Sequence, residues 1–238
     1  MSRLWDKGLP LDQRVLRYTA GEDHRLDARL VHYDVLGSIA HAEMLADQQL
    51  ISRDDCAAIC DGLQALGESF ANGDWQISLQ DEDAHTALET RLTKAIGSAG
   101  GRLHLGRSRN DQVLTALRLY LRDAASDLAQ RVGELRAAIA ALSERHGKTE
   151  LPGYTHMQHA MPSSVALWCG GYDEGFADAE TGLTLVRQRI NKNPLGSAAG
   201  YGTPGLPLDR DATTRKLDFA ATQQPAAKSR QSGKRIAV

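Results

Sequence analysis

The sequence is poor in cysteine, in aromatic residues and in long apolar runs, and each shortage excludes a class of protein. Its 238 residues include three cysteines, three tryptophans, six tyrosines and three phenylalanines. So few cysteines, and an odd number of them, argue against a disulfide framework and for a reducing compartment. No segment approaches the roughly 20 consecutive apolar residues of a membrane span, and the first residues lack the apolar run of a secretory signal. We therefore expect a cytoplasmic protein.

The sequence also lacks an excess of charge of one sign. The formal net charge is −2, with 42% hydrophobic and 24% charged residues, which are ordinary globular values and exclude a wholly disordered chain. Without a basic excess, we expect neither a nucleic acid nor a membrane as partner. Residues 221–238 contain two lysines, two arginines and no acid. We predict that residues 220–238 form a basic, disordered tail.

What the sequence does have is helical periodicity over most of its length. Residues 52–70 place apolar side chains on one stripe, after Ser52 as a plausible N-cap. Apolar residues also recur at steps of three and four over 110–146, where Gly147 is a natural stop, and over 163–191. No comparable strand pattern is present, so the predicted fold class is all-α.

The length of the helix predicted over 110–146 carries an inference about assembly. At 1.5 Å per residue, about 37 residues span roughly 55 Å, whereas a compact chain of this size has a diameter of roughly 45 Å. The apolar seam needs neighbours along its whole length, from other subunits or from missing chain. We predict a small N-terminal helical domain over 1–105, the first part of a long-helix bundle over 106–219, and the tail.

Two patterns suggest ligand sites that their context does not support. Cys56 and Cys60 have the spacing of half a metal site, but no other ligand type lies nearby at suitable spacing, so packed thiols are favoured. The segment 200–205 matches the dinucleotide-binding pattern G-x-G-x-x-G, but a helix precedes it and Pro204 and Pro207 obstruct the helix that would hold the phosphates. It is interpreted as a glycine loop that must turn sharply.

His85 begins an apolar helical stripe, with carboxylates one turn before and one turn after it. Spacing alone favours a buried core histidine, although the flanking Asp81 and Glu89 are able to raise its pKa.

Ser108 and Asp111 have the S-x-x-D spacing of a helix start. Capping does not explain why Arg107, Arg109 and Asn110 stand at the same place. A helix N-terminus with these side chains is suited to binding a carboxylate, so capping and anion binding both remain open.

Residues 153–159 place Thr155, His156, Gln158 and His159 in one short loop. Two histidines three apart without an adjacent glutamate are a weak zinc signal, and general acid–base catalysis fits at least as well. We predict no metal site.

Taken together, several segments resemble the argininosuccinate lyase family, within the fumarase/aspartase superfamily. They are HLGRSRNDQV at 104–113, GYTHMQ at 153–158, NPLGSAAG at 193–200, YDVLGSIAHA at 33–42 and EDAH at 82–85. The resemblance runs in order from about residue 3 to 219. It implies reversible cleavage of argininosuccinate to arginine and fumarate in arginine biosynthesis, without metal or organic cofactor. It also implies a homotetramer whose active sites draw on three subunits.

The resemblance further implies roles for individual residues in a β-elimination. His156 is expected to be the acid–base residue, and Asn110 and Thr155 are expected to bind substrate. The other expected site residues, which line or orient the pocket, are Ser108, Arg109, His85 and Gln158.

Two departures from the family pattern qualify this interpretation. Asp23 stands where many members have a substrate-binding serine. The family also continues well beyond the matching part, with a flexible loop that holds a catalytic serine and with a substrate-binding lysine. We therefore expect a truncated chain whose own activity is weakened or absent. The alternatives are another superfamily lyase such as adenylosuccinate lyase, a metal-dependent hydrolase using His156 and His159, or an inactive subunit that only co-assembles.

Overall fold

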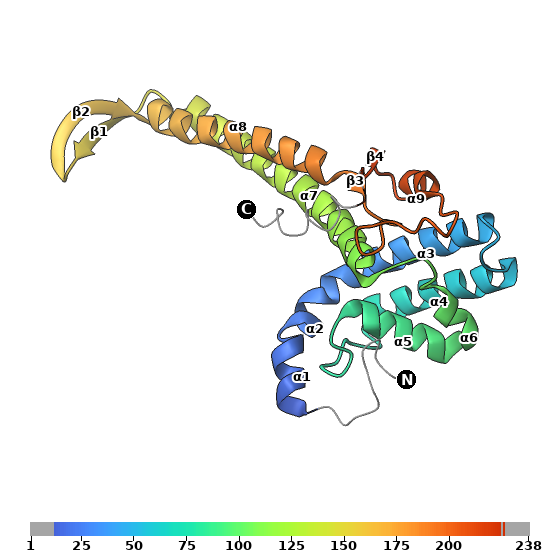
Figure 1. Cartoon of the computed structure of the whole chain (residues 1–238). Helices are drawn as coiled ribbons and strands as arrows, with labels where there is room; N and C mark the ends of the chain where they lie inside the picture. Colours follow the sequence, from blue (N-terminus) through green and yellow to red (C-terminus); the bar gives the residue numbers. More distant parts are fainter. Residues whose placement is uncertain (1–11, 225, 227–238) are drawn as a thin grey trace. The chain divides into compact units, whose positions relative to one another are not determined.

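The computed structural model describes residues 12–224 and 226, and its internal contacts divide the chain into two compact units. The first unit comprises residues 1–120 and 191–238, and the second comprises residues 121–190. Helix α7 runs from the first into the second (Figure 1). The described elements are α1 (Gln13–Ala20), α2 (Asp23–Leu26), η1 (Asp27–Leu30), α3 (Val31–Asp47), α4 (Arg53–Ala71), α5 (Ala84–Ile96), α6 (Ser98–Arg102), α7 (Arg109–His146), β1 (Glu150–Thr155), β2 (Gln158–Ser164), α8 (Val165–Ile190), β3 (Lys192–Asn193), α9 (Arg210–Lys216) and β4 (Ala221–Thr222).

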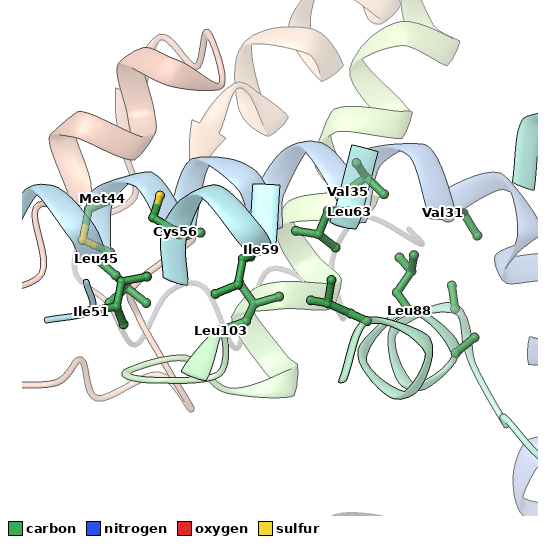
Figure 2. Packing of buried hydrophobic residues seen from close by; sticks show 14 of the residues in the cluster. Val31, Val35, Met44, Leu45, Ile51, Cys56, Ile59, Leu63, Leu88 and Leu103 are labelled. Carbon is green, nitrogen blue, oxygen red and sulfur yellow. The ribbon is translucent and has the colours of Figure 1, made fainter. Parts of the chain in front are cut away.

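The core of the first unit lies between α3, α4 and α5. Two of these helices start at side-chain caps: Ser52 accepts from the amide of Asp55, and Asp83 accepts from the amide of Thr86. Their apolar stripes interlock, and Ile59 of α4 and Leu88 of α5 are at most 1% exposed (Figure 2). Burying such side chains is worth roughly 1.5–3 kcal/mol each, so this cluster fixes the helices that support the candidate site.

A second, smaller cluster joins the start of α7 to the last described residues. Leu119 packs with Leu195, Leu217 and Phe219. Next to it, β4 pairs in parallel with β3, and the amide of Gln223 donates to the carbonyl of Asn193 at 2.8 Å. The predicted disorder from residue 220 is therefore wrong for 221–223, because strand pairing and burial order these residues. The basic residues of the predicted tail lie outside the described part of the chain.

The second unit consists of the rest of α7, the β1–β2 hairpin and α8. Within it, Arg136 of α7 bonds Asp173 and Glu180 of α8, at 2.8 and 2.5 Å. Large apolar side chains of both helices remain 42–68% exposed: Leu128, Leu135, Leu167, Trp168, Tyr172, Leu185 and Val186. The predicted unpartnered seam is thus present in the isolated chain.

The long-helix predictions and the all-α fold class are confirmed, and the prediction that residues 153–159 form a loop is wrong except at the turn. These residues belong to the β1–β2 hairpin, which has a register irregularity between Pro152 and Tyr154. Because both strands are mostly exposed on both faces, they carry no apolar alternation for sequence reasoning to detect. The predicted domain division at residue 105 stays a prediction. Over residues 12–224 and 226, no helix is both long and apolar enough to cross a membrane.

Candidate active site

The start of α7 is built as the sequence predicts. The backbone amide of Ser108 donates to Asp111 Oδ1 at 2.9 Å, while Ser108 Oγ accepts from the amide of Asn110 at 3.2 Å. These are the two reciprocal contacts of a helix start, and they leave the exposed Asn110 side chain beside the Ser108 hydroxyl at 3.0 Å. Capping and an accessible polar group therefore coexist at this helix end.

Glu89 holds the cationic side chains that surround this helix start. Its carboxylate accepts from Arg107 at 3.2 Å, from Arg109 at 3.2 and 3.4 Å, and lies 3.2 Å from His104 Nδ1. Burial alone would raise the pKa of Glu89, but the bond from His104 and the charges of both arginines outweigh it and hold the pKa at about 2. Glu89 is therefore ionised and fixes the direction of both guanidinium groups.

Asp34 and His85 form a fully buried pair behind the helix start. His85 Nδ1 lies 2.9 Å from Asp34 Oδ2, and the two side chains are 1% and 2% exposed. Burial opposes both charges, but the pairing lowers the pKa of Asp34 to about 2 and raises that of His85 above its ordinary value. Among the described residues, the buried His85 Nε2 has no hydrogen-bond partner, and Nδ1 has none besides its contact with Asp34. His85 is thus buried, as its spacing favours, and its partner Asp34 is a charged group.

Asp111 ties the helix start to the loop that follows α8. Its Oδ2 accepts from the amides of Gly196 and Ala198, at 2.9 and 2.8 Å. Burial raises the pKa of Asp111 although these amides favour its charged form. Gly196 has φ +80°, a conformation that glycine adopts without strain. The predicted glycine loop also turns as expected, with positive φ at Gly200 and Gly202.

Thr155, His156 and Gln158 lie at the tip of the β1–β2 hairpin in the second unit. Thr155 and Gln158 face each other as the last strand pair, and His156 and Met157 make the turn between them. Thr155 Oγ1 lies 2.9 Å from His156 Nδ1, and both side chains are exposed. This contact leaves the other ring nitrogen of His156 available to exchange a proton.

The predicted site residues therefore fall into two groups. Ser108, Arg109, Asn110 and His85 belong to one polar network of the first unit, whereas the hairpin group belongs to the second unit. Asp23 is exposed at the first position of α2.

Sequence reasoning missed three residues of the first group: Asp34, Glu89 and Gln112. Glu89 was noted only as a neighbour of His85. The sequence offered one clue to Glu89: two arginines next to the same helix start need a carboxylate partner.

The described residues show no group of three or more His, Cys, Asp or Glu side chains arranged to hold a metal ion. Arg109 and Asn110 at the start of α7 are suited to binding an anion. Taken by itself, the exposed His156 in the hairpin turn is suited to moving a proton.

A sequence profile of the family described as "Lyase" matches residues 12–235. The chain belongs to this lyase family. It is 44% identical over 218 residues to argininosuccinate lyase of Sorangium cellulosum, covering 92% of this chain and 50% of that protein. It is 38% identical to argininosuccinate lyase of Thermotoga neapolitana, covering 93% of this chain and 55% of that protein.

Among solved structures, the chain is similar to an EDDS lyase variant with bound fumarate. The identity is 28% and the TM-score 0.76, over 94% of this chain and 44% of that one. The chain therefore spans about half the length of the relatives that it matches.

Proposed function

We propose that this lyase takes part in the reversible β-elimination of argininosuccinate to arginine and fumarate, as a carbon–nitrogen lyase of arginine biosynthesis. The observation that carries the proposal is the 44% identity to an argininosuccinate lyase over 92% of the chain. Two separate features support the proposal: the polar network at the start of α7 is suited to binding an anion, and the histidine of the hairpin turn is suited to transferring a proton.

The reaction removes a proton from the carbon next to a substrate carboxylate and breaks the bond to a guanidino nitrogen. The electron pair of the C–H bond forms the double bond of fumarate, and the departing nitrogen is protonated to give arginine. Such a proton is weakly acidic, so charge stabilisation on the carboxylate is needed, worth roughly 10²–10³ in rate per well-placed donor. An acid–base group adds roughly 10²–10⁴.

We assign the acid–base role to His156 and a substrate-binding role to Thr155, whose hydroxyl contacts the ring. Asn110 is the substrate-binding donor at the start of α7, because its side chain is exposed while Arg109 is engaged by Glu89. Ser108, Arg109, His85 and Gln158 are assigned roles in lining or orienting substrate sites that the proposed assembly would build from different subunits. Self-association into a homotetramer, in the cytoplasm, completes the proposal; the exposed apolar side chains of α7 and α8 support it.

The decisive experiment measures fumarate release from argininosuccinate by the purified chain. It is run alone and with the unmatched C-terminal part of a full-length relative added, with His156→Ala as the control for contaminating enzyme. Release that disappears in His156→Ala supports the proposal, either for the chain alone or for the complemented pair. No release under either condition refutes it and leaves an inactive subunit as the interpretation.

EDDS is the second candidate substrate, because the structural neighbour at TM-score 0.76 is an EDDS lyase variant. The same assay with EDDS in place of argininosuccinate separates the two. A higher kcat/KM for EDDS would reassign the substrate while keeping the elimination chemistry.

A further inference from the structure

The turn that carries His156 has a backbone conformation that residues other than glycine seldom adopt. His156 has φ +51° and Met157 has φ +63°, both in the left-handed region. A two-residue hairpin turn of type I′ requires positive φ at both central positions, and asparagine and glycine are the residues that usually supply it. Positive φ is uncommon for residues other than glycine, although histidine adopts it more often than most, and two successive residues keep it where the surrounding structure holds them there.

The strands next to this turn provide one specific side-chain contact. Tyr154 and His159 are direct partners in the strand register, one pair outward from Thr155 and Gln158. Tyr154 Oη lies 3.0 Å from His159 Nε2, and the two ring centroids are 4.9 Å apart. Both side chains are exposed, so no apolar core competes with this contact in holding the strand ends together.

We propose that Tyr154 and His159 form a cross-strand clamp that holds the strained His156–Met157 turn, and that they are positioning residues for His156. The inference rests on the acid–base role proposed for His156. Neither residue touches the reacting atoms in this proposal. They act by keeping the turn closed, so that the His156 ring stays against Thr155 Oγ1 at 2.9 Å.

The physical consequence concerns the two nitrogens of the His156 ring. While the turn is held, the contact with Thr155 engages Nδ1 and leaves Nε2 as the nitrogen open to a proton-exchange partner. If the clamp is lost, the turn relaxes toward negative φ, the ring leaves Thr155, and the two neutral tautomers mix. The chemical shifts of the ring nitrogens therefore show whether the clamp is intact, and measuring them does not require catalytic activity.

The test is nuclear magnetic resonance of the intact 238-residue chain with ¹⁵N-labelled histidine. Tyr154→Phe removes the hydroxyl but keeps the aromatic ring, and His159→Ala removes the partner. Tyr201→Phe, which removes an exposed hydroxyl in the first unit, is the matched control. We expect one tautomer of His156 in the wild type and in Tyr201→Phe, and averaged ring-nitrogen shifts in the two clamp variants.

A rescue variant separates positioning from general damage to the hairpin. Met157→Gly relieves the strain at one of the two turn positions, so adding it to Tyr154→Phe should restore the wild-type His156 signals. His156 signals that are identical in the wild type and both clamp variants would overturn the proposal, as would equal changes in Tyr201→Phe. An absence of elimination activity would count against the proposed function alone, because the nitrogen shifts measure the clamp independently.

Discussion

The side-chain amide of Gln112 donates to both carboxylate oxygens of Asp34, at 3.0 and 3.1 Å. Its own oxygen accepts from Arg109 at 2.9 Å. These contacts close a ring of polar side chains that supports the helix start from behind, formed by Asp34, Gln112, Arg109, Glu89, Arg107 and Ser38. Each member of the ring has a partner of opposite charge or complementary hydrogen bonding, so removing one leaves another buried group unsatisfied.

Glu89→Gln tests how much the Glu89 carboxylate in this ring stabilises the protein. The pKa of Glu89 lies at about 2 in the folded chain against an ordinary value of 4.5. A depressed pKa stabilises the fold above the unfolded pKa, and this stabilisation is lost as the pH falls toward the folded value. We expect urea unfolding near neutral pH to show a loss of about 3 kcal/mol in Glu89→Gln, shrinking as the pH is lowered through about 4 to 2.

The matched control for this variant is Glu68→Gln, an exposed position on α4 whose carboxylate accepts from Gln64 at 3.0 Å. An exposed substitution of this kind should change the free energy of unfolding by less than about 0.5 kcal/mol. An equal loss of unfolding free energy in the two variants would show that Glu89 does not stabilise the ring of polar side chains.

The His85–Asp34 pair predicts a pH dependence of opposite sign. Because pairing raises the pKa of His85 above its ordinary 6.5, its contribution to stability is complete below that value and is lost as the pH rises through the folded pKa. The stability difference between the wild type and His85→Gln should therefore be larger near pH 5.5 than near pH 9. Urea unfolding at both pH values measures it. A difference that is constant with pH would show that His85 acts only by packing.

The sequence was informative where a pattern is local and uninformative where it is not. The helix α7 was predictable because its apolar side chains repeat at helical spacing over the whole segment. The Ser108–Asp111 cap was predictable because its partners are three residues apart. The ring was not, since Gln112 and Asp34 are 78 residues apart and only folding shows that they meet. The hairpin was missed because its exposed strands have no apolar face.

Gly153→Ala tests whether the hairpin needs a residue without a Cβ atom at position 153, three residues before His156. A Cβ atom on Gly153 would collide with the carbonyl oxygen of Met161 on the facing strand, so the strands must separate there. Overpacking of this kind typically costs about 1–3 kcal/mol. We expect faster amide hydrogen exchange throughout β1 and β2 in this variant.

Gly170→Ala is the control for that substitution, because a Cβ on Gly170 meets no atom within 4 Å and the residue lies inside α8. Alanine is favoured over glycine within a helix by roughly 0.5–1 kcal/mol. This variant should therefore slow amide hydrogen exchange in α8 and should not speed exchange in the hairpin. Faster hairpin exchange in both variants would contradict the collision as the cause.

Self-association is tested best on the apolar side chains that α7 leaves uncovered. Leu128 and Leu135, seven residues apart on α7, are 49% and 44% exposed, and repeated exposed apolar side chains on one helix are what an interaction site needs. We expect light scattering after size exclusion to give the wild type a mass above that of one chain, and to give Leu128→Lys/Leu135→Lys a mass shifted toward the monomer. Tyr201→Lys, at an 81% exposed position of the first unit, should leave the mass unchanged. A monomeric wild type, or equal masses for the double variant and the wild type, would show that these helices are not the surface through which the chain assembles.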